Sequence, residues 1–441
     1  MNVHRWTEQP ASGSSPATAP YWWRAAPRSD DPPAELPATT DVAIVGSGFT
    51  GLNAALVLAR AGRSVTIIEA GRPGQGASSR NAGYVGRSLK HGFLELSETR
   101  GLDFALDIYR ELQAAFDTVI DVVEREQIAC MMQRCGRYVL ATSQSQYDAL
   151  ARELDAKHKH LGDEFEMVPR SRQHREIGSD AYFGGAVIPN HRGLHPGLYH
   201  AGLLDRVRAS GASIVAGTRV TDIGRGPGDG DFEVVTSRGM LRARHVAVAT
   251  NGYTSAVPWL QRRVIPFDAY LMATEPLPAP VIDRILPRGR TALDTNFNIN
   301  FIRRSPDGTR VLFGGRTGTR FSSPGECAWR IKQDFGQLVP ELGDVKLDHV
   351  WTGRCAGTFD LFPHIGVHEG IHYALGYCFA GVPMGTHLGR KMAFRILGSP
   401  EGRTAFDDLD FPTMPFYGGN PWFVPLAMKA YDLMDWWNTR R

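Results

Sequence analysis

Cysteine is scarce in this chain. Its 441 residues include five cysteines, an odd number in which no two have the CxxC spacing. A disulfide framework or a cysteine-based zinc site needs paired thiols, so this usage argues against both kinds of protein. We expect reduced thiols at all five positions, which are Cys130, Cys135, Cys327, Cys355 and Cys378.

The sequence also lacks the signatures of a nucleic-acid-binding protein, a signal peptide and a metal site. The net charge of +3 is small and the arginines are scattered without a basic stripe, so no nucleic-acid partner is predicted. The first 20 residues are polar and contain no apolar stretch able to serve as a signal peptide, so the expected location is the cytoplasm. The 14 histidines lack metal-ligand spacing, and no metal site is expected.

What the chain does contain is the composition of an ordinary globular protein. Apolar residues make up 42% of it and charged residues 22%. Its 441 residues are about three times the length of a typical domain, so two domains with a substantial core are expected.

Residues 41–70 have the order strand, glycine turn, helix, strand and acid. Residues 42–45 are a short apolar run typical of a buried strand, and a GxGxxG motif follows directly. Gly46 allows the tight turn, Gly48 lets the backbone approach a pyrophosphate, and Gly51 lets the helix pack closely on the strand. The N–H groups and dipole of that helix would then hold the phosphates.

The second strand of this unit supports the same interpretation. It covers residues 65–68 and ends at Glu69, about 20 residues beyond the glycines, where an acid can accept both ribose hydroxyls and disfavours a 2′-phosphate. A glycine-rich turn in another αβ unit is the competing interpretation, but all parts of the motif occur in order. The segment therefore predicts a dinucleotide other than NADP.

Two further segments favour FAD over NAD. Residues 71–83 are small and hydrogen-bonding, which suits a loop along an extended phosphate and ribityl chain. Strand-like runs over 232–235 and 244–248 lead into Ala249-Thr250-Asn251-Gly252, a pattern that brings backbone close to a cofactor a second time.

Together these pieces resemble the FAD-dependent D-amino-acid oxidase superfamily, and within it the gamma-glutamylputrescine oxidoreductase, sarcosine oxidase and glycine oxidase branches. The matching segments cover nearly the whole chain in the right order. Besides those above they are Tyr21-Trp22, the stretch 76–83 that is similar to GASGRNGG, 271–277, 305–308 with 313–316, and 373–377 with Gly381 and Gly389.

The resemblance implies an α/β fold with a discontinuous Rossmann-type FAD-binding domain and an α+β substrate domain built on an antiparallel sheet. The chain is expected to divide into four parts. An N-terminal arm covers 1–37, the FAD-binding domain covers 38–90, 190–258 and 348–400, the substrate domain covers 91–189 and 259–347, and a C-terminal extension covers 401–441. The arm is expected to be anchored at Tyr21-Trp22-Trp23.

Motif and resemblance together assign the cofactor contacts. The resemblance implies that Val220 faces the adenine and that a helix beginning near Gly381 directs its N-terminus at the flavin, where its dipole would stabilise negative charge. The full set is Gly46, Gly48, Phe49, Thr50, Gly51, Glu69, Ala70, Ser78, Ser79, Arg80, Asn81, Gly83, Val220, Ala249, Gly252, Gly381, Val382 and Met384.

The implied reaction is oxidation of a carbon–nitrogen bond in a small-molecule amine or amino acid, with hydride transfer to flavin N5 and hydrolysis of the imine. This chemistry mainly needs an oriented, uncharged amine, which agrees with the lack of an evident Ser-His-Asp set or carboxylate pair. A flavin dehydrogenase of a 2-hydroxy acid and a flavoprotein subunit of an electron-transfer complex are the alternatives.

Two departures from the family leave details open. Pro383 occupies a position where sarcosine oxidases carry a lysine, so the electron acceptor is either O2 or another molecule. Alignment of Thr358-Phe359-Asp360 with the family's Thr-Pro-Asp places Gly353, and not Cys355, at the position of covalent attachment in some members. We therefore expect dissociable FAD.

Substrate contacts are expected from the sheet that covers the flavin. An arginine there would clamp a substrate carboxylate, and Arg303 is preferred to Arg304 and Arg316. Arg304 should point to the opposite side of its strand. Tyr270 and Tyr84 are predicted to line the aromatic part of the pocket, with a core role as the alternative for each.

The C-terminal extension contains a predicted amphipathic helix. Between Trp422 and Trp437 the residues are apolar except for Pro425, Lys429, Asp432 and Asp435, and the charged ones fall on one narrow face. The run is too short to span a bilayer, which takes about 20 apolar residues. It should dock on the protein's own body or on a second copy, or else make a peripheral membrane contact.

Overall fold

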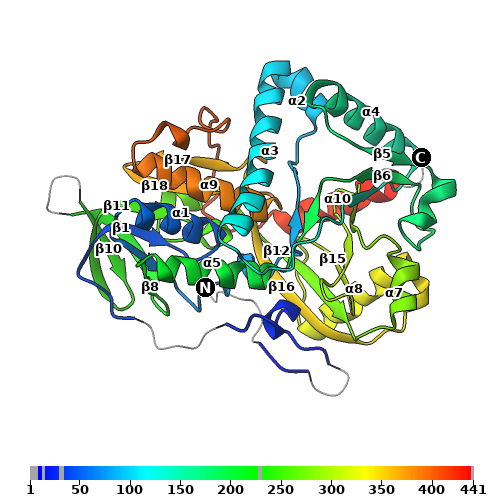
Figure 1. Cartoon of the computed structure of the whole chain (residues 1–441), viewed down its shortest axis with the longest axis horizontal. Helices are drawn as coiled ribbons and strands as arrows, with labels where there is room; N and C mark the ends of the chain where they lie inside the picture. Colours follow the sequence, from blue (N-terminus) through cyan, green and yellow to red (C-terminus); the bar gives the residue numbers. More distant parts are fainter. Residues whose placement is uncertain (1–7, 12–14, 29–33, 227–230, 439–441) are drawn as a thin grey trace.

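Two eight-stranded sheets organise the chain in this computed structural model, which describes residues 8–11, 15–28, 34–226 and 231–438. Figure 1 shows one sheet with α1 and α9 on the left and the other with α7 and α8 on the right. The predicted arm lies partly outside the described residues, at 1–7, 12–14 and 29–33. No helix in the described ranges is both long and apolar enough to cross a membrane.

The first sheet is the predicted Rossmann-type sheet. Its parallel centre places β11 beside β1, β1 beside β2 and β2 beside β8. The connections from β1 to β2 and from β2 to β8 contain helices, which let these strands run in the same direction. Its strands are β17 (His364–His368), β18 (Ile371–Leu375), β11 (Gly239–Val248), β1 (Thr39–Val45), β2 (Val65–Ile68) and β8 (Ser213–Val215), with β9 (Val220–Arg225) and β10 (Phe232–Thr236) attached through β11.

The second sheet is antiparallel except where β13 runs parallel to β4. Its strands, in order, are β16 (Leu347–Gly357), β12 (Ile265–Thr274), β15 (Val311–Gly315), β14 (Phe301–Arg304), β13 (Thr291–Asp294), β4 (Arg137–Leu140), β6 (Gly185–Ile188) and β5 (Glu166–Val168). A two-stranded ribbon of β3 (Tyr84–Val85) and β7 (Arg192–Gly193) completes the strands.

Helices cover both sheets. The α-helices are α1 (Phe49–Arg60), α2 (Phe93–Arg100), α3 (Leu102–Arg125), α4 (Gln144–Leu161), α5 (Pro196–Ala209), α6 (Pro258–Gln261), α7 (Ala279–Ile285), α8 (Pro324–Leu338), α9 (Gly381–Ile396) and α10 (Val424–Asn438). Short 3-10 turns are η1 (Tyr21–Arg24), η2 (Ala77–Ser79), η3 (Arg170–Arg175), η4 (Asn251–Tyr253), η5 (Pro340–Leu342) and η6 (Pro400–Gly402).

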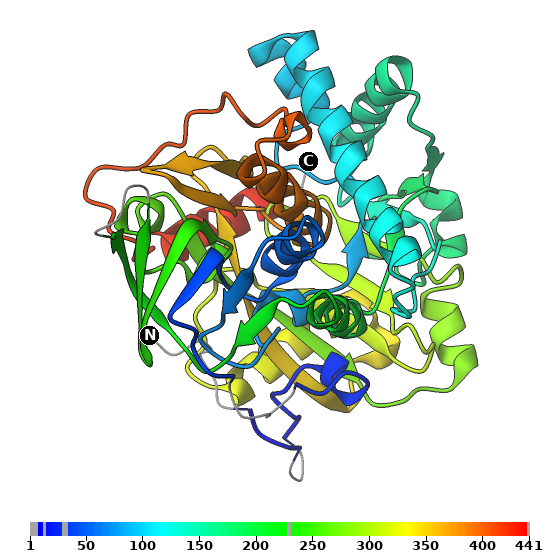
Figure 2. The ribbon, with the colours of Figure 1, turned by 60° about the vertical axis from the view of Figure 1, so that its left-hand side comes forward.

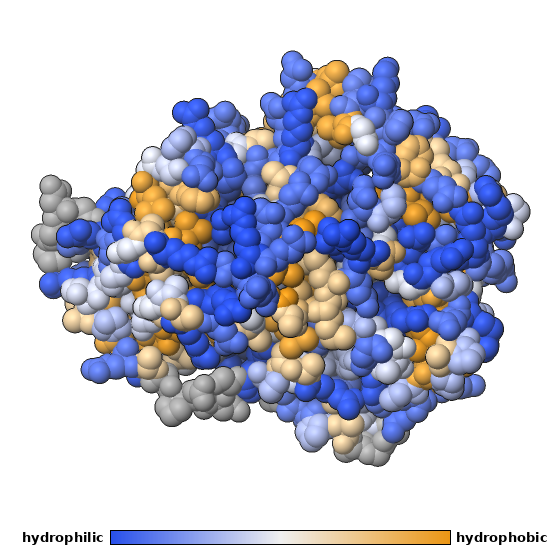
Figure 3. All heavy atoms as spheres, in the orientation of Figure 1, coloured by the Kyte–Doolittle hydropathy of each residue, from blue (hydrophilic) through white to orange (hydrophobic). Residues whose placement is uncertain are grey.

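The largest apolar core surrounds α1 and α9, which lie side by side in Figure 2. Glycine makes this close packing possible: a Cβ at Gly389 of α9 would lie 2.3 Å from the carbonyl oxygen of Thr50 in α1. A second core fills the space between α8 and one face of the second sheet. On the face drawn in Figure 3 the apolar side chains form small groups between hydrophilic ones.

The strand pairing differs from the predicted division at residue 348. That boundary assigns the segment after it to the FAD-binding domain, but β16 pairs along its length with β12 of the second sheet. The chain returns to the first sheet at β17. Helix α3, expected in the substrate domain, buries its apolar side in the core around α1 and α9.

The N-terminal arm is anchored where the sequence predicts it. Trp22 in η1 is fully buried and packs with Leu271, Leu312 and Trp351 of the second sheet. The Tyr21 hydroxyl donates to Asp307 Oδ2 at 2.8 Å. These contacts cover part of one face of the second sheet.

The C-terminal helix α10 docks on the protein's own body through its acidic face. Asp435 accepts hydrogen bonds from the backbone N–H groups of Phe297 and Asn298, at 2.8 Å and 3.0 Å. Asp432 accepts from the Asn298 side chain at 2.9 Å. Away from this loop α10 exposes the apolar residues Leu426, Leu433, Met434, Trp436 and Trp437, and Trp422 just before the helix is exposed as well.

Replacing Asp435 by alanine is expected to loosen the loop that α10 holds. The change removes both acceptors for the N–H groups of Phe297 and Asn298, and we expect a local loss of about 1 to 2 kcal/mol because Asp435 is partly solvated. Hydrogen exchange of these two amides should become faster. Asp408→Ala, at an exposed acid outside α10, should leave them unchanged.

Candidate functional site

The turn between β1 and α1 has the geometry that the glycine motif predicts. Gly46 has a φ of +104°, which favours glycine, and a Cβ there would lie 2.9 Å from the carbonyl oxygen of Ala249. A Cβ at Gly51 would lie only 1.9 Å from the Gly46 oxygen. These two glycines therefore bring β1, β11 and the start of α1 together.

Glu69 holds this turn from the end of β2. One carboxylate oxygen accepts from the Ser47 N–H at 3.0 Å and from the Ser47 hydroxyl at 2.7 Å, while the other accepts from the Gly71 N–H at 2.9 Å. Glu69 also lines the cavity beside the turn. Its carboxylate is thus oriented before any ligand binds, as the proposed contact with a ribose requires.

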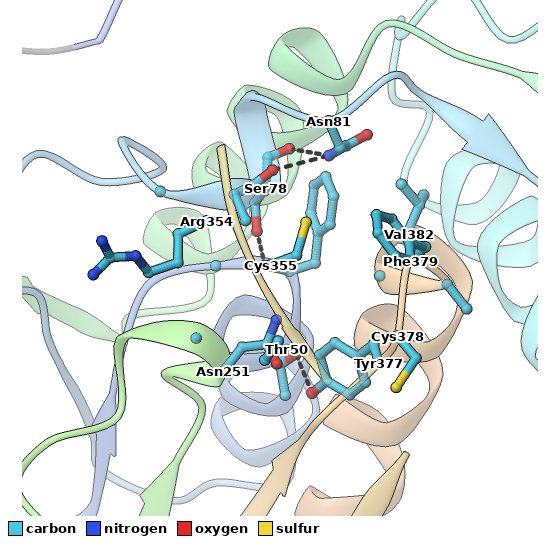
Figure 4. Close-up of a pocket in the computed structure, with 18 of the residues that line it drawn as sticks. Thr50, Ser78, Asn81, Asn251, Arg354, Cys355, Tyr377, Cys378, Phe379 and Val382 are labelled. Atoms are coloured by element: carbon cyan, nitrogen blue, oxygen red, sulfur yellow. Dashed lines mark hydrogen bonds between the residues drawn. The ribbon is translucent and has the colours of Figure 1, made fainter. Parts of the chain in front are cut away.

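The loop after Glu69 folds back over the start of α1. Ser78 Oγ accepts from the Phe49 N–H at 2.9 Å, and the Asn81 amide donates to the carbonyls of Ala77 and Ser78. Figure 4 shows Ser78 and Asn81 together above the pocket. The small and hydrogen-bonding residues of this stretch therefore form a cradle along one side of the cavity.

Some residues predicted to touch the cofactor instead support this loop from behind. Ser79 donates to the Gly74 carbonyl and accepts from the Trp23 indole N–H at 2.8 Å. The Arg80 guanidinium donates to the carbonyls of Gln75 and Thr352, and to Glu8. Neither side chain lines the cavity, because the 3-10 turn η2 directs both away from it.

The cavity has a volume of about 700 Å³ and contacts both sheets. Of the predicted cofactor residues, the ones that line it are Gly46, Gly48, Phe49, Thr50, Glu69, Ala70, Ser78, Asn81, Val220, Ala249, Gly252, Gly381 and Val382. Those that do not are Gly51, Ser79, Arg80, Gly83 and Met384. The motif thus locates the site, while the assignment of single neighbouring residues needed the folded loop.

Two helix N-termini meet this cavity. The first residues of α1 and of α9 line it, and neither helix has a side-chain hydrogen bond at its N-cap. Backbone N–H groups at such ends and the helix dipole favour negative charge. An extended dianionic dinucleotide fits these two sets of donors.

The segment that leads into α9 has a tight backbone. Cys378 and Phe379 have φ values of +44° and +78°, in a region that residues other than glycine rarely adopt. The preceding Tyr377 hydroxyl lies 2.7 Å from Thr50 Oγ1 in α1, as drawn in Figure 4. This bond fixes α9 against the glycine turn, and the sequence analysis missed it because the two residues are far apart in the chain.

The structure places the two tyrosines predicted to contact the substrate in different surroundings. Tyr84 lines the cavity, with its hydroxyl donating to the carbonyls of Ala292 and Ile302. Tyr270 is fully buried in the core of the second sheet and donates to the Thr319 carbonyl. Its neighbours Ala269 and Leu271 line the cavity instead, because adjacent residues in a strand face opposite sides. The prediction for Tyr270 is corrected accordingly.

Arg303 is not available as a carboxylate ligand. Its side chain is 2% exposed, and Nη1 donates to the carbonyls of Ala82, Gly83 and Leu194 at 2.8 Å, 3.2 Å and 3.0 Å. Arg303 shares a face of β14 with Phe301, which does line the cavity, but it lies two residues further along, under the N-terminal arm. The structure therefore corrects this prediction to a structural role.

The two other arginines considered are also engaged. Arg304 pairs with Asp283, and Arg316 pairs with Asp334 through two hydrogen bonds, Nε to Oδ2 at 2.6 Å and Nη2 to Oδ1 at 2.5 Å.

The five cysteines are free thiols. Cys355 lines the cavity, and burial raises the pKa of its thiol to about 12. Within the described ranges, no group of histidine, cysteine and acidic side chains is arranged to hold a metal ion.

A buried histidine supports the glycine turn from below. His200 in α5 donates through Nε2 to the Ser47 carbonyl at 2.8 Å, and its Nδ1 accepts from Arg28 at 3.0 Å. A neutral imidazole satisfies both partners. Burial, followed by the charge of Arg28, lowers the pKa of His200 to about 3. Burial similarly lowers the pKa of the neighbouring His195 to about 4.

Acidification is therefore expected to destabilise the protein at pH values well above those at which carboxylates ordinarily titrate. The pKa values of His200 and His195 in the folded state lie below the ordinary value of 6.5, so the unfolded chain binds protons first. Below pH 6.5 each histidine should cost about 1.4 kcal/mol of unfolding free energy per pH unit. Stability is complete above that pH and falls as the pH decreases.

Urea unfolding between pH 7.5 and pH 5 measures this slope. His200→Gln should reduce the slope by about 1.4 kcal/mol per pH unit, the contribution of one bound proton, because glutamine does not titrate. His174→Gln, at an exposed histidine, should leave it unchanged. An equal slope in His200→Gln and the unmodified protein would contradict the assignment.

Comparison with known proteins agrees with this geometry. A family model described as DAO, FAD dependent oxidoreductase, matches residues 41–395. The probable oxidoreductase OrdL of Haemophilus influenzae is 30% identical over 414 residues, which cover 92% of this chain and 94% of that protein. The gamma-glutamylputrescine oxidoreductase of Escherichia coli is 30% identical over 404 residues, covering 90% of this chain and 93% of that protein.

Solved structures show the same fold. Glycine oxidase from Geobacillus kaustophilus superimposes with a TM-score of 0.69 at 23% identity, covering 87% of this chain and 100% of that one. L-proline dehydrogenase from P. horikoshii gives a TM-score of 0.69 at 16% identity, covering 89% and 99%. The two-sheet architecture is thus the fold of these solved structures.

Proposed function

Because the chain belongs to the family of FAD-dependent oxidoreductases that includes amine and amino-acid oxidising enzymes, we propose that it oxidises a carbon–nitrogen bond of a small amine or amino acid. The observation that carries the proposal is one continuous cavity. It extends from the glycine turn and the N-terminus of α9 to Tyr84, Leu271 and Phe301, so a ligand at the second sheet lies next to the cofactor site.

The cavity residues support orientation and desolvation of an amine. FAD, when bound, supplies the acceptor for a hydride. Leu271, Phe301 and Val139 provide apolar walls that exclude water and favour the uncharged form of an amine. The single proton of the Tyr84 hydroxyl is shared between the backbone carbonyls of Ala292 and Ile302, which fixes its ring as a wall of the pocket. The product imine would then be hydrolysed by water.

Anaerobic stopped-flow measurement of flavin bleaching tests the proposal. The panel contains N-methyl amino acids, D-amino acids, gamma-glutamyl polyamines and 2-hydroxy acids, and air is admitted afterwards. Bleaching by an amine supports the proposed reaction, and the rate of recovery in air distinguishes O2 from another acceptor. Bleaching only by hydroxy acids, or by none of the compounds, would refute it.

The remaining details of cofactor and location are also proposals. We propose dissociable FAD, since Gly353 has no nucleophilic side chain; release of the flavin on acid precipitation checks this. We propose a cytoplasmic enzyme, with the exposed side of α10 contacting either a second copy or a membrane surface. Light scattering of the purified protein and flotation with anionic vesicles separate these two partners.

A further inference from the structure

The cavity has a second end, which is rich in positive charge. Beyond Tyr84 it is lined by the cationic side chains Arg87, Arg137 and Lys157, whose charges all act on His191, and by a single acid, Glu153. They come from the segment after β3, from β4 and from α4, far from the glycine turn in the sequence. A buried excess of cations requires partners, because an unpaired charge is costly to remove from water.

Two of these cations have an acidic partner within the protein. Arg87 pairs with Asp163, and Lys157 pairs with Glu153 at 2.7 Å. Lys90 also lines the cavity but lies nearer the start of α9, 4.9 Å above the ring of Phe379. No carboxylate in the described part of the chain pairs with Arg137, and the positive charge of Arg87 lowers its pKa in addition to burial.

Arg137 has hydrogen-bonding capacity that the protein leaves unused. It is 4% exposed, and its Nη1 donates to Ser88 Oγ at 2.9 Å. Its Nε is buried with no hydrogen-bond partner among the described residues. Its guanidinium lies 5.4 Å from the centre of the Tyr84 ring, which lines the same cavity. Burial lowers the pKa of Arg137 to about 10, so the group is still charged at neutral pH.

The backbone opposite Arg137 is shaped to leave room for the guanidinium. A Cβ at Gly86 would lie 2.8 Å from Arg137 Nη2 and 2.6 Å from His191 Nδ1. His191 Nδ1 is likewise buried without a partner among the described residues. Two adjacent polar groups at this end of the cavity therefore lack the hydrogen bonds that buried groups normally make.

We propose that Arg137 binds the carboxylate of the substrate, an assignment that rests on the proposed amine oxidation. A planar guanidinium offers a carboxylate two parallel hydrogen bonds, and the anion would supply the missing counter-charge. Arg303 cannot do this, because its guanidinium is enclosed by backbone carbonyls.

The proposal narrows the class of substrate. An amine that carries a carboxylate, such as an amino acid or a gamma-glutamyl amine, places its anion at Arg137 and its amine towards the apolar middle of the cavity. A simple polyamine would bring additional positive charge to an end already lined by three cations. The enzyme should therefore prefer the carboxylated member of any matched pair of amines.

Substitution of Arg137 tests this assignment in the FAD-loaded enzyme. Arg137→Met should raise KM for a carboxylated amine about 100-fold and change kcat little, because the lost contact is with a part of the substrate that does not react. Arg137→Lys should recover part of the loss. For the corresponding carboxamide, the unmodified enzyme and Arg137→Met should have similar KM values.

Binding of unreactive anions provides an independent readout. Calorimetric titration should detect pentanoate but not pentanamide in the unmodified protein, and pentanoate binding should disappear in Arg137→Met. If Arg137→Met does not fold, the pentanoate–pentanamide comparison and Arg137→Lys still decide the question. Equal binding of both compounds by the unmodified protein, or an unchanged KM in Arg137→Met, would overturn the assignment.

The two proposals fail in different ways. If no amine bleaches the flavin, the proposed reaction is refuted, while pentanoate binding still reports on Arg137. If carboxylated amines and their carboxamides bleach the flavin equally well, the reaction stands and the assignment of Arg137 is refuted.

Discussion

A Gly48→Val variant is expected to fold but to be purified almost free of FAD. Gly48 is the N-cap of α1 and lines the cavity, with φ and ψ values of −75° and −175° that valine also adopts. The nearest protein atom to an added Cβ is Ser78 Oγ at 2.9 Å, a side-chain atom that can move. The fold should therefore tolerate the change.

Binding of FAD, in contrast, should be much weaker in Gly48→Val. The methyl groups of valine would occupy the space in which the backbone approaches the pyrophosphate, and would cover the N-terminus of α1. We expect FAD affinity to fall at least 100-fold, which corresponds to about 2.8 kcal/mol. The ratio of flavin to protein absorbance and a fluorescence titration with added FAD measure this loss.

A matched substitution separates cofactor loss from unfolding. Gly224→Val lies in β9, where an added Cβ meets nothing within 4 Å and where valine favours the strand. This variant should retain FAD. If Gly48→Val keeps its flavin at the level of Gly224→Val, the assignment of the phosphate site to this turn is wrong.

Arg303→Met is expected to lower the stability of the protein and to leave substrate binding nearly unchanged. The substitution removes four hydrogen bonds from Arg303, one to the Arg304 carbonyl and three to the carbonyls of Ala82, Gly83 and Leu194. Loss of buried hydrogen bonds is unfavourable, but removal of a buried charge offsets part of it. We expect a net loss of about 2 kcal/mol of unfolding free energy.

Urea unfolding and steady-state kinetics distinguish this role from substrate binding. The urea midpoint should decrease in Arg303→Met, while KM for a carboxylated amine should change by less than about twofold. Arg137→Met should show the reverse pattern, with a large change in KM. A large rise in KM caused by Arg303→Met would restore the original prediction that Arg303 clamps the carboxylate.

The loop that follows Glu69 shows what local sequence predicts about the site and what it does not. Its small residues predict a cradle beside the dinucleotide, and Ser78 and Asn81 do line the cavity. The same stretch places Ser79 and Arg80 on the far side, where they bond to backbone carbonyls, Trp23 and Glu8. Composition alone does not reveal which side of a 3-10 turn a residue occupies.

The sequence by itself determined the glycine turn, the family and the FAD cofactor. The glycine turn depends on residues 41–70, where strand, turn, helix and acid are consecutive and each glycine is needed for a local steric reason. The choice of FAD depends on residues 71–83 and 249–252, and the family on segments spread over nearly the whole chain. The predicted strand and helix positions in this unit agree with β1, α1 and β2 because backbone geometry over a few residues decides them.

Only the tertiary structure decided the substrate end of the cavity. Whether an arginine faces a ligand depends on which strand lies next to it, on what covers that strand and on where acidic partners fall. Arg303 donates to the carbonyls of a distant loop, Tyr270 points into the core, and Arg137 lies beside the cavity without a carboxylate partner among the described residues. These are long-range contacts between segments more than 100 residues apart, which no local pattern encodes.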